Sequence, residues 1–259
     1  MRILVANDDG IDAAGIQALI DILKPDHEVY VAAPHRQRSA YSHSVTYFAR
    51  QRQAWKKEID GAAGAWAIDA TPADCVYYGC FAFLKELPDL VIAGINHGEN
   101  LSTDCIYSGT VGAASEGIVI GIPSMAVSLC SFEQQDFSAA AQAAKDLIPY
   151  YMNDPHRKEY MLNVNVPAIP KEQIKGFKVT MTEGDRNYQK EVQVNDQKDG
   201  SYLLVCDNIP VHTENMLNTI EGDVTAVKNG YISVTPMDND LTHHQIMQKM
   251  KGYESIPFK

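Results

Sequence analysis

The stretch MRILVANDDG, residues Met1–Gly10, decides the fold, because it joins a short apolar run to a polar turn. Ile3 to Ala6 contains two β-branched residues, a pattern typical of a parallel strand that is buried on both faces. Asn7-Asp8-Asp9-Gly10 follows at once. Ligands of open α/β sheets bind beyond the carboxyl ends of the strands. The decapeptide therefore predicts a ligand site at the end of the first strand.

Asp8 and Asp9 are adjacent carboxylates, and adjacent residues on a regular strand point to opposite faces. Both can reach one ligand only if the chain leaves strand geometry, and Gly10 permits such a turn. Two carboxylates at close range repel each other unless a positive charge lies between them. A divalent cation is the simplest candidate. The alternative interpretation is a loop in which Asp9 merely caps the next helix.

A strand–helix–strand unit begins with this strand. Apolar residues at helical spacing run from Ile16 to Leu23, Pro25 ends that helix, and residues 28–33 form a second apolar strand. Such a unit implies a right-handed crossover and a parallel sheet. No GxGxxG sequence lies between strand and helix, so a dinucleotide site is not predicted.

The rest of the chain continues this alternation and then changes. We predict helices over 74–84 (capped by Thr71 or Asp69), 109–120, 139–151, 223–227 and 243–250, and strands over 89–93, 124–128, 160–166 and 231–236. From Gly176 the sequence is β-rich, with strands over 177–181, 191–194 and 202–206, and we predict a long hairpin from about Gly176 to Pro210.

The predicted fold is therefore α/β, with a doubly wound, mostly parallel, Rossmann-like sheet and a C-terminal β-hairpin arm. We divide the chain into an α/β catalytic core, residues 1–175, and a second part, residues 176–259. The second part would hold the arm, the last core strand and a C-terminal oligomerisation segment.

Composition limits the partners of this 259-residue chain. A net charge of −11 argues against a broad face for nucleic-acid polymers, which need a basic surface. The five cysteines are scattered and include no CxxC pair, a usage typical of reduced thiols. The sequence shows no signal peptide, and its longest apolar run is too short for a bilayer. We expect a cytoplasmic protein without a membrane partner.

Three polar loops follow predicted strands, and they hold Asp8 with Asp9, Ser39 and Asn96. In a doubly wound sheet these strand ends lie on one edge, so the loops can converge. Two carboxylates, a hydroxyl and an amide oxygen are hard donors that suit Mg²⁺, Mn²⁺ or Ca²⁺ rather than Zn²⁺ or Cu²⁺. Taken singly, Ser39 and Asn96 are more typical of turns and caps. Their convergence favours a metal site.

Ser108-Gly109-Thr110 precedes a predicted helix, and a helix N-terminus with nearby glycine attracts anions. A phosphate fits there, with Asn96 and Asn100 in the preceding loop as further donors. The alternative is a plain helix cap.

The order of these motifs resembles that of the SurE family. The matching segments are Asn7–Gly10, Arg38-Ser39 with Ser42 and Thr46, Thr71–Val76, Gly94–Gly98 and Tyr107–Ala114. The family's members are metal-dependent 5'/3'-nucleotidases. The resemblance implies one divalent cation per subunit, either Mg²⁺ or Mn²⁺, with Ca²⁺ able to occupy the site without activity. It implies metal ligation by Asp8, Asp9, Ser39 and Asn96. It also implies phosphate binding by Asn96, Asn100, Ser108, Gly109 and Thr110.

One departure from the family pattern concerns the loop that holds Ser39. Ala40 stands where the family commonly has glycine, and Ala70 is a second such exchange. Alanine disfavours a positive φ, so Ala40 puts the backbone of this loop in question.

The predicted function is metal-dependent hydrolysis of nucleoside 5'- and 3'-monophosphates, with short-chain polyphosphate as a further substrate. Asp8 and Asp9 are the candidate catalytic residues, with Asp8 accepting the proton of water and Asp9 holding the ion, a division that sequence does not establish. An aspartyl-phosphate ranks lower, because no DxD spacing is present at the first strand. The rival functions are a non-catalytic nucleotide-binding module clamped by metal and a metal-dependent glycosyltransferase. We also expect a homodimer or homotetramer built through the arm.

Overall fold

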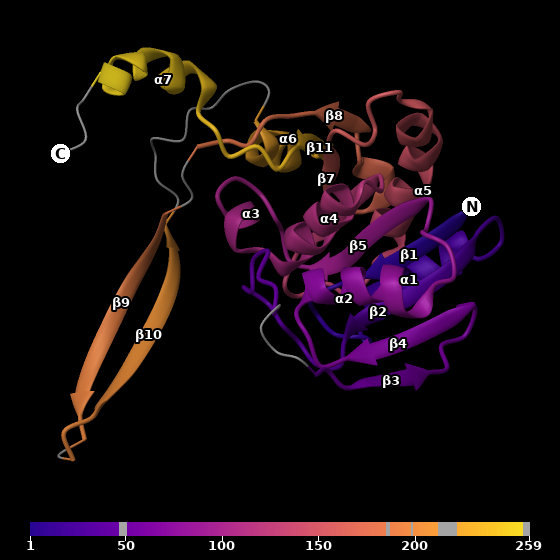
Figure 1. Cartoon of the computed structure of the whole chain (residues 1–259), viewed down its shortest axis with the longest axis horizontal. Helices are drawn as coiled ribbons and strands as arrows, with labels where there is room; N and C mark the ends of the chain where they lie inside the picture. Colours follow the sequence, from indigo (N-terminus) through magenta and orange to yellow (C-terminus); the bar gives the residue numbers. More distant parts are fainter. Residues whose placement is uncertain (47–50, 185–186, 198, 212–221, 256–259) are drawn as a thin grey trace.

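A nine-stranded mixed sheet forms the centre of the computed structural model, in the order β3-β4-β2-β1-β5-β6-β7-β11-β8 (Figure 1). The structure describes all residues except 47–50, 185–186, 198, 212–221 and 256–259. The strands are β1 (Arg2–Ala6), β2 (Glu28–Pro34), β3 (Ala54–Lys57), β4 (Gly64–Ile68), β5 (Leu90–His97), β6 (Ser124–Cys130), β7 (Met161–Pro167), β8 (Phe177–Val179) and β11 (Ile232–Met237). Neighbours from β4 to β7 pair in parallel, whereas β3 and β11 pair antiparallel with β4 and β7.

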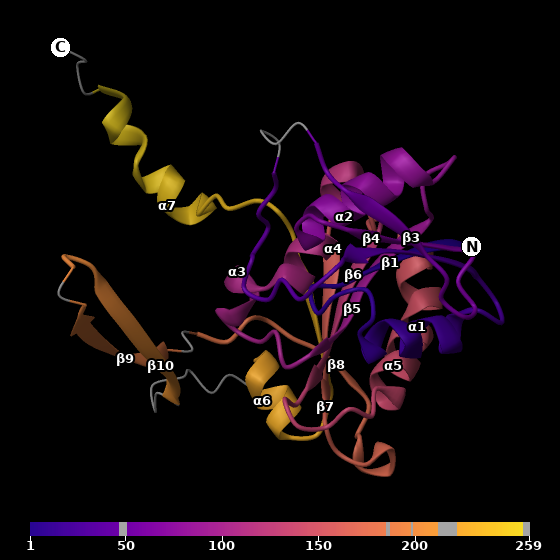
Figure 2. The same ribbon diagram turned by 90° about the horizontal axis from the view of Figure 1, so that it is seen from below.

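Helices cover both faces of the sheet, which confirms the doubly wound α/β prediction (Figure 2). On one face lie α1 (Ala14–Leu23) and α5 (Ser138–Asn153), and on the other lie α2 (Pro72–Tyr78), its continuation η1 (Gly79–Phe83) and α4 (Gly109–Ile120). Ile3 and Val5 of β1 belong to the first core, and Leu4 and Ala6 to the second. The first strand is thus buried on both faces, as its sequence predicts.

The chain reverses its direction across the sheet between β1 and β5. From β1 it passes through α1 to β2 on one side, and β5 later pairs with the other side of β1. Such a switch point opens a crevice at the carboxyl ends of the two strands. Asp8 and Asp9 follow β1, and Asn96 lies near the end of β5. The candidate ligands therefore lie at the switch point.

The connection through α5 differs in hand from the others. The α1 connection runs from β1 to β2, toward the β3 edge of the sheet, and the α5 connection runs from β6 to β7, toward the β8 edge. Both helices nevertheless lie on the same face of the sheet. The α1 and α5 connections therefore have opposite hands, and those through α2 and α4 share the hand of α1. Since nearly all parallel crossovers have one hand, α5 is the exception.

The C-terminal part confirms the hairpin arm but corrects its start. The arm consists of β9 (Asn187–Asp196) and β10 (Tyr202–Val211), which form a separate antiparallel pair and project from the core (Figure 1). The prediction that residues 177–181 belong to the hairpin is wrong, because β8 pairs with β11 in the main sheet. The division at residue 175 stays a prediction.

The remaining elements are short. They are α3 (Asp104–Tyr107), η2 (Lys171–Gln173), α6 (Asp223–Lys228), α7 (His244–Lys249) and η3 (Lys251–Ser255). Within the described part of the chain, no helix has both the length and the apolar character needed to cross a bilayer.

Candidate active site

The Asn7–Gly10 turn gives Asp8 and Asp9 their positions. The side chain of Asn7 closes the turn, with Nδ2 donating to the carbonyl of Gly10 at 2.9 Å and Oδ1 accepting from the N–H of Gly10 at 3.2 Å. Gly10 has a φ of +105°, which glycine adopts without strain. The chain thus leaves strand geometry where the paired carboxylates require it. Asn7 therefore shapes the site although sequence analysis assigned it no role.

The N-terminus of α4 lies directly against Asp8. Thr110 Oγ1 donates a hydrogen bond of 2.5 Å to Asp8 Oδ1. A Cβ on Gly109 would lie 2.8 Å from the Cβ of Asp8, so only glycine permits this approach. The positive end of the helix dipole therefore faces a buried carboxylate.

Asp9 is held by β5 rather than by α4. Its Oδ2 accepts the backbone N–H of His97 at 3.1 Å. The neighbouring Asn96 donates Nδ2 to the carbonyl of Gly98 at 2.9 Å. This bond orients the amide, so that Oδ1 of Asn96 points away from Gly98. The strand β5 continues through this motif, with an irregular register between Ala93 and Asn96, although we predicted its end at Ala93.

Burial raises the pKa of both carboxyl groups. The pKa of Asp8 rises to about 6, chiefly through desolvation and also through the charge of Asp9, while the hydrogen bond from Thr110 opposes the rise. Desolvation likewise raises the pKa of Asp9, against the N–H of His97. A nearby cation would relieve both effects, and these oxygen donors fit a divalent ion such as Mg²⁺ or Mn²⁺. No three His, Cys, Asp or Glu side chains cluster for metal binding among the described residues, so neutral oxygens would have to complete the coordination.

The loop that holds Ser39 is tied to Asp8 through its backbone. The N–H of Arg38 donates to the carbonyl of Asp8 at 2.6 Å. Ser39 itself is exposed, and its Oγ accepts from Gln37 at 3.0 Å. Ala40 adopts a φ of +61°, so the loop keeps the left-handed conformation even though alanine replaces the usual glycine.

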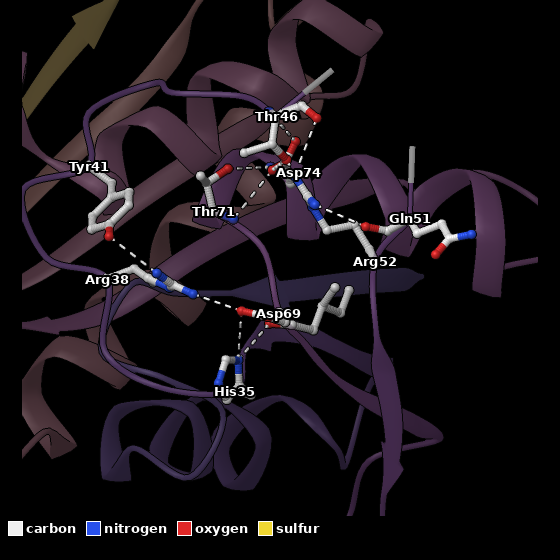
Figure 3. Close-up of polar contacts among 10 residues, drawn as sticks. His35, Arg38, Tyr41, Thr46, Gln51, Arg52, Asp69, Thr71 and Asp74 are labelled. Atoms are coloured by element: carbon white, nitrogen blue, oxygen red, sulfur yellow. Dashed lines mark hydrogen bonds and ion pairs between the residues drawn. The ribbon is translucent and has the colours of Figure 1, made fainter. Parts of the chain in front are cut away.

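The guanidinium of Arg38 is held by hydrogen bonds to side chains around this loop (Figure 3). It donates to Asp69 Oδ1 at 2.8 Å and to the hydroxyl of Tyr41 at 3.2 Å, and His35 Nδ1 lies 3.5 Å from the same Asp69 oxygen. The ion pair therefore fastens the Ser39 loop to the end of β4.

A second anchor holds the same loop further along (Figure 3). Thr71 caps α2 in a reciprocal arrangement with Asp74, which confirms Thr71 as the predicted cap. The Asp74 carboxylate also accepts from the N–H of Thr46 at 3.1 Å and from its Oγ1 at 2.5 Å, and Arg52 Nε donates to that Oγ1 at 3.1 Å. The Thr71–Val76 segment therefore supports the loop structurally.

Ser108 and Asn100 make other contacts than Thr110 does. Ser108 is the N-cap of α4, its Oγ accepting from the N–H of Val111 at 3.0 Å. Asn100 is buried and donates Nδ2 to Ser128 Oγ at 2.8 Å. Direct contacts thus join Asp8 to Thr110 and Asp9 to the 96–97 segment, while Ser39, Ser108 and Asn100 lie in the adjoining loops.

Comparison with known proteins identifies the family. The model of the family "Survival protein SurE" matches residues 3–190. The chain belongs to the SurE family. "5'-nucleotidase SurE" of Synechococcus elongatus is 40% identical over 258 residues, covering 96% of this chain and 98% of that protein. The protein of the same name from Pelotomaculum thermopropionicum is 43% identical over 251 residues, covering 97% and 94%.

A solved SurE structure supports the same assignment at the level of fold. The crystal structure of the SurE protein from Aquifex aeolicus matches with a TM-score of 0.81 and 38% identity, covering 98% of this chain and all of that chain. The SurE-like α/β fold and the family resemblance are both confirmed.

Proposed function

We propose that this chain is a metal-dependent 5'-nucleotidase that hydrolyses nucleoside 5'-monophosphates to nucleoside and phosphate. The observation that carries the proposal is the meeting of Asp8 and Asp9, at the switch point of the sheet, with the N-terminus of α4. An acidic pair suits a cation, and a helix N-terminus suits an anion. Curated relatives over nearly the whole chain are named 5'-nucleotidase SurE, which supports the same activity.

Membership of the family implies a divalent metal ion. We propose Mg²⁺ or Mn²⁺, one per subunit, with Asp8, Asp9, Ser39 and Asn96 as its ligands. When bound, the ion supplies charge neutralisation and polarisation of the phosphoryl oxygens.

The positions of Asp8 and Asp9 suggest different roles for the two carboxylates. Asp8 contacts the N-terminus of α4, where we place the phosphate, so we assign Asp8 to accept the proton of the attacking water. Asp9 is bonded to the segment that includes Asn96, and we assign it to metal binding. Backbone N–H groups at Gly109 and Thr110 would stabilise the phosphoryl oxygens while the bond to the leaving oxygen breaks.

Two further activities belong to the proposal. We include nucleoside 3'-monophosphates and short-chain polyphosphate as substrates, because a site that binds mainly the phosphoryl group and a cation selects little for the leaving group. The base of the nucleotide would lie outside these contacts.

The decisive experiment measures free phosphate from 5'-AMP, 3'-AMP and tripolyphosphate with Mg²⁺, with Mn²⁺ and with a chelator. We expect activity with metal, none with chelator, and a loss of at least about 100-fold for Asp8→Asn and Asp9→Asn. Asp12→Asn is the matched control, since this exposed carboxylate near the same turn pairs with Lys57. Near-normal turnover in either site variant would remove that residue from the active site.

The same measurement separates the rival functions. Tight nucleotide binding without phosphate release would indicate a non-catalytic binding module. Consumption of a sugar nucleotide without release of inorganic phosphate would indicate a glycosyltransferase.

The arm carries a second part of the proposal, a homodimer or homotetramer. One face of the β9–β10 pair carries four exposed apolar residues, namely Val192, Val194, Tyr202 and Leu204. An isolated two-stranded hairpin has little stability of its own, and an exposed apolar stripe needs cover. A second copy of the chain, which carries the same stripe, is the occupant that we propose.

A further inference from the structure

Strand β7 carries two buried asparagines on the face that looks away from α5. Leu162, Val164 and Val166 alternate with them and pack into the core beneath α1 and α5. Asn163 and Asn165 are both 0% exposed. Burying an amide side chain is costly unless it is hydrogen-bonded, so these two residues require specific partners.

Both asparagines bind the backbone of the same residue, Asn100. Asn163 Nδ2 donates to the carbonyl of Asn100 at 2.8 Å, and Asn165 Nδ2 donates to the same carbonyl at 3.0 Å. Asn165 Oδ1 also accepts the N–H of Asn100 at 2.8 Å. A single side chain thus pairs with both main-chain groups of Asn100, as a neighbouring strand would.

The side chain of Asn100 is fixed by β6. Its Nδ2 donates to Ser128 Oγ at 2.8 Å, and Ser128 is 0% exposed. That nitrogen carries two N–H groups, so binding to Ser128 orients the second one without consuming it. The residues of β6 and β7 therefore set both the position and the orientation of Asn100.

The family resemblance makes Asn100 one of the residues that bind the phosphate. In the sequence it falls between His97, whose N–H holds Asp9, and the Ser108–Thr110 segment, whose last residue holds Asp8. We infer that Asn165 and Ser128, supported by Asn163, are positioning residues that place Asn100 for the phosphoryl group. This inference rests on the proposed function and names the residues that would position one further donor to its phosphate.

The competing explanation is that these side chains only stabilise the fold, and the chain offers a matched control. Ser233 of β11 lies directly opposite Asn165 in the sheet register and is also 0% exposed. Its Oγ shares a hydrogen bond of 2.7 Å with Thr180. Ser233→Ala therefore removes a buried polar contact at the same level of the sheet without touching Asn100.

The test compares kcat and KM for 5'-AMP, Mn²⁺ affinity and thermal stability in Asn165→Leu, Ser128→Ala and Ser233→Ala. We expect kcat/KM to fall about 100-fold in Asn165→Leu, the order of loss that follows a small misplacement of a binding group. For Ser128→Ala we expect roughly a 5- to 10-fold fall, equivalent to one hydrogen bond. Mn²⁺ affinity should change less than about twofold, because the side chains of Asn165 and Ser128 bond to Asn100 rather than to a proposed metal ligand. Ser233→Ala should melt earlier but keep its kinetics.

A double-mutant cycle makes the inference falsifiable even where Asn165→Leu fails to fold. Ser128 acts only through the Asn100 side chain in this account, so Ser128→Ala should cause no further loss in an Asn100→Ala background. Unchanged kinetics in folded Asn165→Leu or Ser128→Ala, or losses that add in the cycle, would overturn the inference. A wild-type protein that releases no phosphate would instead defeat the proposed function. In that case faster hydrogen exchange across 98–108 in Ser128→Ala, but not in Ser233→Ala, would still support the positioning, and equal exchange would refute it.

Discussion

Thr110 donates its hydroxyl to Asp8 across 102 positions of sequence, and this 2.5 Å hydrogen bond joins the end of the first strand to the start of α4. The contact gives Thr110 a role that its place in a phosphate-binding motif does not predict. It orients a proposed metal ligand, while the cap of α4 is supplied by Ser108.

Removing the Thr110 hydroxyl should therefore weaken metal binding. Hydrogen bonds to charged groups contribute about 1.5–3 kcal/mol, so we expect Thr110→Ala to lower Mn²⁺ affinity roughly 10- to 100-fold. Thr110→Ser keeps the hydroxyl and should stay close to wild type. Ser108→Ala should cost about 1 kcal/mol of stability as a lost cap but leave Mn²⁺ affinity unchanged. Isothermal titration with Mn²⁺ and thermal melts decide, and equal Mn²⁺ affinities for Thr110→Ala and wild type would contradict this role.

The stability of the metal-free protein should depend on the protonation of Asp8. Its pKa is raised by burial from 3.8 to about 6, so between these values the folded chain binds a proton that the unfolded chain lacks. The stabilising contribution is complete below pH 4 and is lost as pH rises through 6. The full change corresponds to about 3 kcal/mol.

Asp8→Asn stays neutral and isolates this effect. With chelator present, the variant should match wild type near pH 4 and exceed its free energy of unfolding by up to about 3 kcal/mol above pH 7. Urea unfolding of both proteins from pH 4 to 8 measures the difference. A difference that does not vary with pH would show that Asp8 does not carry this proton.

Ala40→Gly should stabilise the chain. A left-handed backbone destabilises a residue that has a Cβ by roughly 1–2 kcal/mol. Glycine removes this strain from the folded state, but it also raises the conformational entropy of the unfolded chain, which offsets part of the stabilisation. Since Ala40 is exposed with a φ of +61°, we expect a net increase of about 0.5–1 kcal/mol in the free energy of unfolding. Ala54→Gly, in exposed strand β3, should lose a similar amount. A loss of stability in Ala40→Gly would argue against the left-handed conformation.

Disrupting the apolar stripe of the arm should change the mass in solution. We expect sedimentation at micromolar concentration to show a dimer or larger for wild type and a smaller species for Leu204→Asp. Gln193→Asp, on the opposite face of the hairpin, is the control, since Leu204 pairs with Val194 while Gln193 pairs with Val205. A monomeric wild type would refute the proposed assembly.

Sequence patterns predict an element well when the signals that start and end it lie within a few residues of it. The predicted helix 109–120 agrees with α4 at both ends, since Ser108 provides a cap and Gly121 a left-handed stop. Gly94 misled the prediction for β5, because glycine usually ends a strand, whereas here the strand continues irregularly to His97. Pairing partners are not encoded locally, so the β-rich residues 177–181 predict a strand of the hairpin, whereas β8 pairs with β11 in the main sheet.

The candidate site divides in the same way. Asp8 and Asp9 can be recognised from the sequence, because two adjacent carboxylates follow an apolar strand. The contacts of Thr110 with Asp8 and of Asn165 with Asn100 join residues that only the folded sheet brings together. No spacing in the sequence indicates them, although two asparagines inside the predicted strand 160–166 are unusual for a strand.

The unusual hand of the α5 connection determines the polarity of β7. A crossover of the common hand would lay its helix over the other side of this strand, and an apolar helix face would require apolar residues at 163 and 165. Because α5 passes over the α1 side instead, residues 163 and 165 face the loop at Asn100, whose backbone groups need polar partners. The chirality of one connection thus dictates which amino acids a neighbouring strand can hold, and a designer who reversed it would have to rewrite β7 as well.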